Sequence, residues 1–387
     1  MMRHHNTPYR ILRHALVGLM GLFSSLSIAQ SSLPEWPVFQ TQQQQQLSTI
    51  LQQSTPGQVV YVGETHNRYA DHLLQGAVLA SFVDQGKPVA LGVEWFQRPF
   101  QSVVNRYIAG EISEAELLRG TEYFKRWGFD YRHYRALMRY AREHKIPVIA
   151  MNAAKEVTDA VMMQGLDNVS AGIKAQLPLS YDFDIGDYRK ALEKIFGQHD
   201  HAEESDDDGV DRFMQVQLTW DETMAESVAR YMQQHPSSHI VVLAGRGHVH
   251  KAGIPSRVTR RVGGRSLIIN SYQADSPFNE ADYWVLQEDI KLPPKGLMAV
   301  GLTDAQHGVE VTSIAPYSKA GDAGMKLGDR IVALGNTTIN DFIDVKMALM
   351  DAAPGDQVRT LVLRKEGGQE VSLPLQLSLV DPPADPH

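Results

Sequence analysis

The sequence predicts an α/β fold with a mostly parallel sheet and helices on both faces, followed by a small β-rich domain. Short apolar runs, which are typical of buried strands, alternate with stretches of helical spacing over most of the chain. This alternation indicates a parallel sheet, because a strand that returns in the same direction needs a crossover helix. The buried strands are expected at residues 59–62, 89–93, 146–151, 239–243 and 267–269.

The chain of 387 residues is long enough for two ordinary domains. It has 37 Lys and Arg against 45 Asp and Glu, which gives a net charge of −8. This balance argues against nucleic acid as a partner, because binding to phosphates favours a basic surface. The expected segments are a signal peptide at 1–29, a first domain at 30–285, a linker at 286–295, a second domain at 296–378 and a tail at 379–387.

The first 29 residues have the features of an export signal. Arg3, Arg10 and Arg13 form a basic region. An apolar run at 15–26 follows, and a small-x-small cleavage site ends at Ala29. The run is short for a transmembrane helix, and an uncleaved anchor is the alternative. The chain has no cysteine, hence no lipid-attachment site, disulfide or thiolate ligand, so we expect a soluble periplasmic or secreted protein.

The stretch 59–74, VVYVGETHNRYADHLL, organises the first domain. Gly63 ends a buried strand, and Glu64 and His66 follow at its carboxyl end, where open α/β sheets bind their ligands. His72 falls near the start of the next helix. A carboxylate and an imidazole at this position indicate a polar ligand, a metal or a cofactor. A charged surface loop is the alternative interpretation.

Three further strand ends carry polar residues. Glu94 follows the strand at 89–93, and Asn152 follows the strand at 146–151. After the strand at 239–243, Arg246 lies between two glycines and His248 comes next but one. Because the carboxyl ends of parallel strands meet at one edge of a sheet, we expect these side chains to form one site.

The segment 123–140 is unusually aromatic and includes Tyr131 and Tyr134. A phenolate can ligate ferric haem, and aromatic walls suit a flat macrocycle. Core packing is the alternative for any single one of these rings. With no thiolate in the chain, a metal or haem would have to use His, Tyr, Met or carboxylate ligands.

Two polar stretches have simpler interpretations. The glutamine run at 42–46 is expected in a helix before the first strand, without a function. The acidic stretch 198–211 contains His199, Asp200 and His201, which could hold a metal loosely. A solvated loop is the favoured interpretation of such a charge run.

The first domain resembles the ChaN family, the haem-binding uptake proteins of the Tiki superfamily, over about residues 50–275. The resemblance rests on GETH with His72, on the strand that ends at Glu94, and on the block DYRHYRALMRYAREHKIPVIAMN at 130–152. The sequences QLTWDETMA at 217–225 and AGRGHVHKAGIP at 244–255 complete it. The absence of a lipid-attachment cysteine departs from the family's usual lipoprotein form.

The resemblance implies haem binding in iron acquisition or handling, with Tyr ligation, a His nearby and paired subunits. It does not identify which Tyr ligates the iron. The candidate haem-binding residues are His66, His72, Tyr131, Tyr134, Asn152, Arg246 and His248.

The second domain is similar to a PDZ domain. Val300, Gly301 and Leu302 resemble the loop that receives a ligand's C-terminal carboxylate, and residues 308–336 match the bacterial PDZ pattern. A helix at 342–350 would flank the peptide groove. The resemblance implies binding to the C-terminus of an envelope protein by strand addition. A module that only packs on the first domain is the alternative.

Two main functions remain open at this stage. The first is an exported haem-binding protein with a peptide-binding module. The second is a metal-dependent hydrolase with Glu64 and Glu94 as catalytic carboxylates, and with a divalent ion on Glu64, His66 and His248. The chemistry of the residues alone serves both equally, and the resemblance favours haem. An interaction scaffold without an active cleft is a third interpretation.

Overall fold

The computed structural model describes residues 37–40, 43–183, 186, 188–189, 207–273, 276 and 279–383. The signal peptide predicted at 1–29 and the possible metal ligands at 199–201 fall outside these ranges. None of the helices described in the structure combines the length and apolar character needed to cross a membrane.

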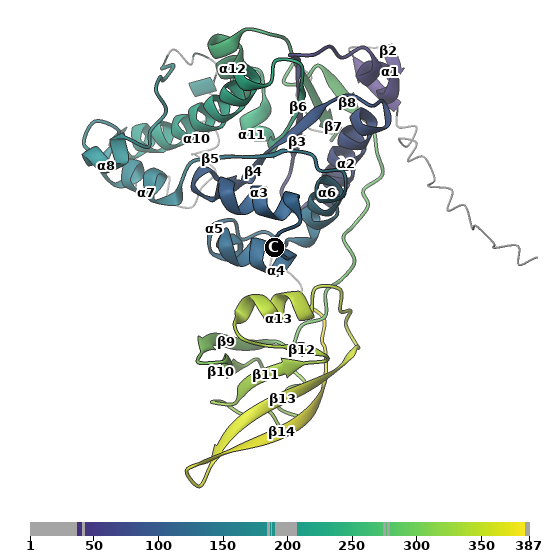
Figure 1. Cartoon of the computed structure of the whole chain (residues 1–387), viewed down its shortest axis with the longest axis vertical. Coiled ribbons are helices and arrows are strands. Elements are labelled where there is room, and N and C mark those ends of the chain that lie inside the picture. The colour runs from purple at the N-terminus through teal and green to yellow at the C-terminus, as the bar shows by residue number, and fades with distance from the viewer. Residues whose placement is uncertain are drawn as a thin grey trace, which may run out of the picture. The chain divides into compact units, whose positions relative to one another are not determined.

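The first domain is built around an eight-stranded sheet with the strand order β2-β1-β8-β7-β3-β6-β4-β5 (Figure 1). The six strands from β8 to β5 are parallel, whereas β1 and β2 are antiparallel. The strands are β1 (Pro37–Gln40), β2 (Gln43–Gln46), β3 (Val59–Glu64), β4 (Val89–Gln97), β5 (Val148–Asn152), β6 (His239–Gly245), β7 (Ser266–Ser271) and β8 (Tyr283–Val285).

Helices cover both faces of this sheet. Side chains alternate between the two faces along each strand, so each face presents apolar side chains that a helix buries. Val60 and Val62 of β3 pack in a core with α2, α3, α4 and α6, whereas Val59 and Tyr61 pack in a second core with α10 and α12. The helices are α1 (Leu47–Gln52), α2 (Tyr69–Asp84), η1 (Arg98–Phe100), α3 (Gln101–Ala109), α4 (Glu114–Gly120), α5 (Tyr123–Arg126), α6 (Arg132–Glu143), α7 (Lys155–Gln164), α8 (Ala171–Lys174), α10 (Asp207–Gln234), α11 (Arg246–Val249) and α12 (Ile254–Val262).

The predicted fold class is confirmed, and the five predicted strands are present as β3 to β7. The helix expected for the glutamine run was wrong, because Gln43–Gln46 is strand β2 and the helix begins at Leu47. Backbone pairing with β1 overrides the helix propensity of glutamine at this edge. Strand β4 also continues past the expected end, so Glu94 lies within it, at a shift in the register with β5.

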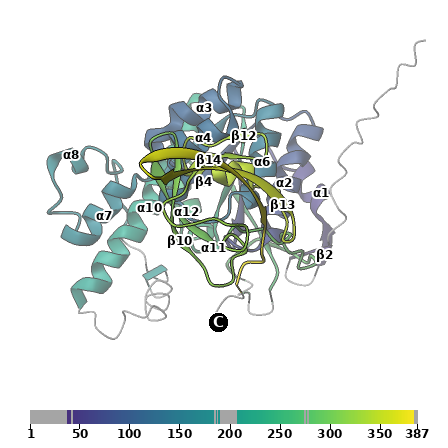
Figure 2. The same cartoon turned by 90° about the horizontal axis from the view of Figure 1, so that it is seen from below.

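Helices α7 and α8 lie beside α10 on the β5 side of the sheet, in Figure 1 and again in the turned view of Figure 2, and α10 also packs on a face of the sheet with α12. Ser227 of α10 donates a hydrogen bond to the Met151 carbonyl of β5 over 3.0 Å. This packing carries α10 and α7 to the carboxyl end of β5, where the polar strand ends gather.

The second domain is an antiparallel sheet with the order β14-β13-β11-β10-β9, in which β12 pairs with β11. Val309, Ile331 and Val362 form the centre of its own apolar core. Strand β9 lies at the edge of the sheet. The elements are β9 (Val300–Ala305), β10 (Gly308–Ile314), β11 (Arg330–Leu334), β12 (Thr337–Thr338), α13 (Phe342–Ala348), β13 (Gln357–Glu366) and β14 (Gln369–Ser378).

Candidate functional site

A pocket of about 350 Å³ opens at the carboxyl ends of the central strands. Its walls come from β4, β5 and the loop after β3, together with α5 and the residue that follows it, α7, α10 and α11. This is the edge at which open α/β sheets bind ligands. The lining residues are His66, Glu94, Trp95, Gln97, Arg126, Trp127, Asn152, Lys155, Thr158, Asp159, Trp220 and His248.

The ends of β3 and β6 lie side by side, with Gly63 paired to Ala244 and Glu64 paired to Gly245. The backbone N–H of Gly63 donates to Asn270 Oδ1 over 3.0 Å. A Cβ at Gly63 would collide with the Asn270 side chain and with Val249, so this position requires glycine. The tight packing fixes where Glu64 and the following loop lie.

Glu64 is buried and holds three hydrogen bonds. Its Oε1 accepts from His66 Nδ1 over 2.8 Å and from the Tyr134 hydroxyl over 2.9 Å. Its Oε2 accepts from Gln75 Nε2 over 2.6 Å. Burial opposes the charge of Glu64, but the hydrogen bond from His66 and the field of His72 outweigh it and lower its pKa. Glu64 is therefore a fixed carboxylate behind His66.

The His66 ring is clamped by two aromatic rings, with centroids 4.9 Å from Trp127 and 4.6 Å from Phe129. Burial opposes its charge, but the hydrogen bond to Glu64 and the field of Glu94 raise its pKa. Its outer edge lies against Gly245, where a Cβ would be 3.2 Å from Nε2. Among the described residues, no hydrogen bond to this Nε2 is present, and 27% of the side chain is exposed.

His248 lies between two carboxylates. Its Nδ1 is 2.6 Å from Asp221 Oδ1, and its Nε2 is 3.5 Å from Glu94 Oε1. Burial opposes its charge, but Glu94 and Asp221 raise its pKa to about 9. Tyr188 donates to the second oxygen of Asp221 over 2.6 Å, and Gly245 N–H donates to Glu94 Oε2 over 2.7 Å. His248 is thus an imidazolium at neutral pH.

Four of the candidate haem-binding residues do not line the pocket. His72 is buried, with its Nε2 donating to the His66 carbonyl over 3.0 Å. Arg246 turns towards β7 and donates to the Ser271 carbonyl over 3.0 Å. Tyr131 and Tyr134 are fully buried and donate to Glu114 and Glu64, respectively.

The structure brings together His66, Glu94, Asn152 and His248 of the predicted set at the pocket. Glu64 lies directly behind His66. Within the part of the chain that the structure describes, no group of three or more His, Asp or Glu side chains is arranged to hold a metal ion.

Several lining residues had no predicted role, and Trp220 on α10 is one of them; its neighbour Asp221, which is buried behind the pocket beside His248, had none either. Both lie in the block QLTWDETMA at 217–225, which carries part of the family resemblance and was the signal that could have found them. Arg126 and Lys155 also lie at the pocket, where they pair with carboxylates: Arg126 Nη2 lies 2.8 Å from Glu156, and Lys155 Nζ lies 2.8 Å from Asp159.

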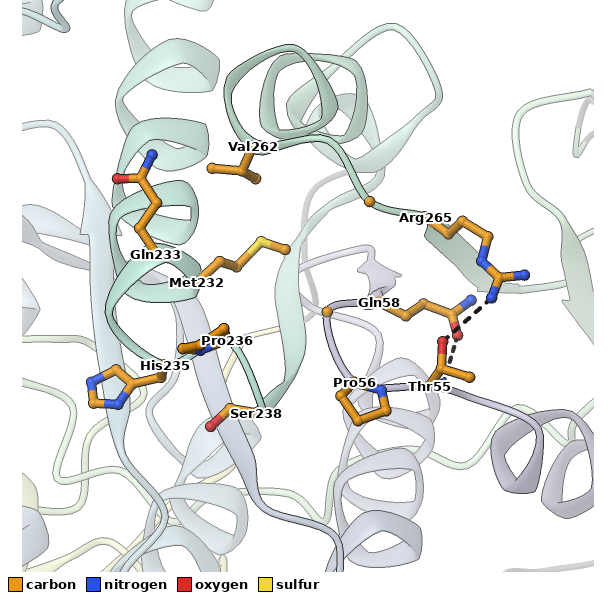
Figure 3. Close-up of a pocket in the computed structure, with 12 residues that line it drawn as sticks. Thr55, Pro56, Gln58, Met232, Gln233, His235, Pro236, Ser238, Val262 and Arg265 are labelled. Atoms are coloured by element: carbon orange, nitrogen blue, oxygen red, sulfur yellow. Dashed lines mark hydrogen bonds between the residues drawn. The ribbon is translucent and has the colours of Figure 1, made fainter.

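A second pocket of about 380 Å³ lies at the opposite edge of the sheet, near the first residues of β3, β6 and β7. Figure 3 shows Met232, Val262 and two prolines in it, with Arg265 turned to Thr55 at 3.4 Å. Its lining includes only two ionisable side chains, His235 and Arg265. It lacks the acid–base groups of the first pocket, which is therefore the candidate site.

In the second domain, Val300, Gly301 and Leu302 lie on the edge strand β9. Val300 and Leu302 are half-buried and pack on the domain's core. A Cβ at Gly301 would collide with Ser313 on β10, so this glycine is needed for strand pairing. Helix α13 lies beside β9, and Asp304 Oδ1 accepts from the Phe342 N–H at its start over 2.7 Å.

Comparison with known proteins identifies both domains. Residues 38–258 match the family model described as haem-binding uptake, Tiki superfamily, ChaN, and residues 296–375 match the model of the PDZ domain. Among solved structures, ChaN of Campylobacter jejuni, described as showing cofacial haem binding, aligns with 65% of this chain and 97% of its own. The identity is 14% and the TM-score is 0.53, so this likeness shows the fold alone.

Two further solved structures align with about a quarter of the chain. An HtrA-type protease AlgW with a decapeptide is 18% identical over 24% of this chain and 30% of its own, with a TM-score of 0.21. A serine endoprotease from Yersinia pestis is 23% identical over 23% of this chain and 29% of its own, with a TM-score of 0.19. TM-scores this low establish no likeness of fold. The comparison with curated proteins found no match.

Proposed function

Since the chain belongs to the ChaN family of haem-binding uptake proteins, whose model matches more than half of its residues, we propose that the pocket binds haem as cargo. In this proposal the protein is exported to the cell envelope, acts in haem or iron acquisition, and works as paired subunits. Its PDZ domain binds the C-terminus of another envelope protein.

The observation that carries this proposal is the combination of aromatic walls with an available imidazole nitrogen. Trp95, Trp127 and Trp220 line the pocket, and flat aromatic rings suit a porphyrin. Haem brings four nitrogen ligands of its own, so its iron needs only one or two protein side chains. His66 presents one unbonded nitrogen beside these walls.

Cationic groups are available for the two haem propionates. His248 is charged in the pocket, and Arg126 and Lys155 lie in its lining. Both Arg126 and Lys155 already pair with surface carboxylates, which a propionate could replace with little loss, because exposed ion pairs contribute about 1 kcal/mol or less. The lining therefore fits an apolar macrocycle with an anionic edge.

A haemin titration followed by visible absorption tests the proposal. A saturable, shifted Soret band with a fixed number of haems per chain is expected. Iron-free protoporphyrin IX is the matched control, and it is expected to bind more weakly because it stacks on the walls without an iron–ligand bond. Weak binding without saturation, equal for both porphyrins, would contradict the proposal. Sedimentation with and without haemin tests the pairing of subunits.

A hydrolase is the second candidate, and one observation favours it. Asp221, His248 and Glu94 form a continuous chain of charged groups that ends in the pocket, an arrangement suited to acid–base work. If haemin does not bind, hydrolysis of a peptide library and a p-nitrophenyl ester with added Zn²⁺ or Mn²⁺ is the next measurement. Activity that is lost in both Glu64→Gln and Glu94→Gln would support this function.

The peptide-binding role is tested with the full chain and a library of C-terminal peptides. Binding of a peptide with a free carboxylate, and no binding of its C-terminal amide, is expected, because the backbone N–H groups near Gly301 would receive the carboxylate. A Gly301 variant is an unsuitable control, since the structure needs glycine there for strand pairing. Equal binding of acid and amide would contradict the proposal.

Export is tested by the mass of the protein recovered from the producing cell's envelope. Cleavage after Ala29 leaves a chain that starts at Gln30. An intact N-terminus in the envelope fraction would instead support the uncleaved anchor.

A further inference from the structure

We propose that the second domain positions one wall of the pocket in the first domain. Helix α13 holds the short helix α5, which ends at Arg126 and is followed by Trp127, and both of these residues line the pocket. The inference deepens the proposed function and rests on it, because the pocket is the site proposed to bind haem. The contacts of α13 on two of its sides carry it.

Helix α13 has two apolar faces, and each packs in a different core. Val345 and Leu349, four positions apart, are buried in the core of the second domain. Ile343 and Met347, also four positions apart, pack against the core of the first domain, and Met350 is 1% exposed within that core. Residues four apart lie on one face of a helix. The second face would be exposed if the second domain stood alone, so it is the surface by which this domain docks on the first.

An arginine on α4 fixes the start of α13. Arg119 donates two hydrogen bonds to Asp341, over 2.5 and 3.0 Å, and one to Asp344 over 2.9 Å. Asp341 is also the N-cap of α13, because its side chain accepts from the Asp344 N–H over 3.0 Å. A guanidinium that bonds both oxygens of a carboxylate fixes direction as well as distance. Arg119 therefore sets the orientation of α13 against the first domain.

Helix α5 meets α13 through aromatic and cationic contacts. The Phe342 ring of α13 lies edge-on to the Phe124 ring of α5, with centroids 6.5 Å apart. Lys346 Nζ lies 4.9 Å from the Phe342 centroid and 5.6 Å from the Phe124 centroid, so one ammonium contacts both rings. These contacts join α13 to a residue that lies two positions before Arg126.

The same short helix reaches the pocket. Arg126 and Trp127 line it, and the Trp127 ring centroid lies 4.9 Å from that of His66. Trp127 Nε1 donates to the Tyr134 hydroxyl over 3.0 Å, and Tyr134 in turn donates to Glu64. A shift of α5 therefore changes both the wall of the pocket and the surroundings of His66.

Helix α5 is too short to hold its own position. It has four residues, fewer than an isolated helix needs in water. Left-handed residues stand on both sides of it, Glu122 with a φ of 50° and Gly128 with a φ of 84°. This conformation is unfavourable for glutamate, which has a Cβ. Tyr123 anchors the helix in the core of the first domain, and Phe124 contacts α13. The wall thus depends on packing from both domains.

Tryptophan emission reports the state of this wall without haem. The chain has five tryptophans, all of them before residue 285, and Trp95, Trp127 and Trp220 line the pocket. The sequence from 296 to 378 contains none. A change made in the second domain therefore alters the emission only through its effect on the first domain.

The first test removes the cation between the two rings. Lys346→Gln is expected to shift the emission to longer wavelength, because Trp127 becomes more exposed, and to weaken haemin binding about two- to fivefold, the strength of a cation–π contact. Lys346→Arg keeps a cation at this place and should match the wild type in both measurements. Lys365→Gln, at an exposed lysine on β13, is the matched control and should match it too.

The second test reverses the charge that fixes α13. Arg119→Glu places a third carboxylate beside Asp341 and Asp344, and we again expect a shift to longer wavelength and weaker haemin binding. Arg106→Glu on α3 is the matched control, since its exposed partner Glu111, 3.7 Å away, belongs to the first domain. The control should match the wild type. Circular dichroism establishes that each variant is folded.

These outcomes separate the inference from the function on which it rests. If the wild type binds no haemin, the proposed function fails, and the tryptophan emission of the variants still decides whether α13 positions the wall. If the wild type binds haemin, and folded Arg119→Glu and Lys346→Gln proteins keep its emission and its affinity, the function stands and the positioning role of the second domain is overturned.

Discussion

The two central strand ends, Gly63–His66 and Gly245–His248, have the same spacing and different side-chain partners. Both run Gly-x-x-His, and they leave neighbouring parallel strands with an offset of one residue, since Glu64 and not Gly63 pairs with Gly245. His66 has one carboxylate at Nδ1 and an unbonded Nε2, whereas His248 has a carboxylate at each nitrogen. Carboxylates raise the pKa of both histidines, and His248, which has one at each nitrogen, is the more firmly fixed positive charge.

The difference shows that the spacing of a motif positions a side chain but does not decide its chemistry. The partners decide it, and they come from elsewhere in the chain: Tyr134 and Gln75 for the first end, Asp221 for the second. Changes at these partners, and at the two glycines, therefore test the comparison directly.

The largest expected effect is at the first glycine. Gly63→Ala would drive a methyl group into Asn270 and Val249, and we expect a loss of about 3 kcal/mol in the free energy of unfolding, at the upper end for an overpacked core. At Gly245 the nearest atoms belong to the His66 side chain, so Gly245→Ala should affect haemin binding far more than stability. Urea unfolding of both variants measures the contrast.

Gly76→Ala is the matched control for this prediction. Gly76 lies within α2, where a Cβ meets nothing within 4 Å, so alanine should raise stability by about 0.5–1 kcal/mol through helix propensity. If Gly63→Ala were as stable as the wild type, the close packing of the first strand end would be refuted.

The next effect is a pH dependence of stability from His248. Glu94 and Asp221 raise its pKa from 6.5 to about 9 in the folded chain, against burial and the nearby charge of Arg257. The folded state then holds more protons than the unfolded state between these values, so stability falls as the pH rises through this window. The stabilisation is fully present below pH 6.5 and is lost above about 9, and it amounts to at most about 3 kcal/mol.

The measurement compares unfolding free energies at pH 6 and pH 9.5 in the wild type and in His248→Gln. The difference between the two proteins reports His248 together with the smaller change at His66, whose pKa the charge of His248 lowers. The wild type should lose more stability at high pH than the variant. Identical pH profiles would show that His248 is not an imidazolium held by its carboxylates.

The sequence predicted the sheet and most of the site because both depend on local patterns. Apolar runs located β3 to β7, and the polar residues after them located His66, Glu94, Asn152 and His248 at one edge. Strands β1, β2 and β8 were missed because they are short and depend on pairing with each other, which no local pattern reveals.

The roles within the site were harder to predict than its position. His72, Tyr131 and Tyr134 were candidate cofactor residues, but they face inward to hold backbone or carboxylate groups. The direction in which a helical side chain points depends on which face of the helix packs on the core, and the residue type alone does not reveal that face. Asp221 was missed for the same reason, since its effect requires a contact with His248, 27 residues further along the chain.

The smallest expected effect separates a supporting tyrosine from a ligating one. Tyr134→Phe removes one hydrogen bond to Glu64 and one from the Trp127 indole, and we expect a loss of about 1–2 kcal/mol in unfolding free energy. Glu64 keeps its bonds to His66 and Gln75, so the position of the Soret band in the haem complex should be unchanged. Loss of that band in a folded Tyr134→Phe protein would make Tyr134 the iron ligand and remove the contrast between the two strand ends.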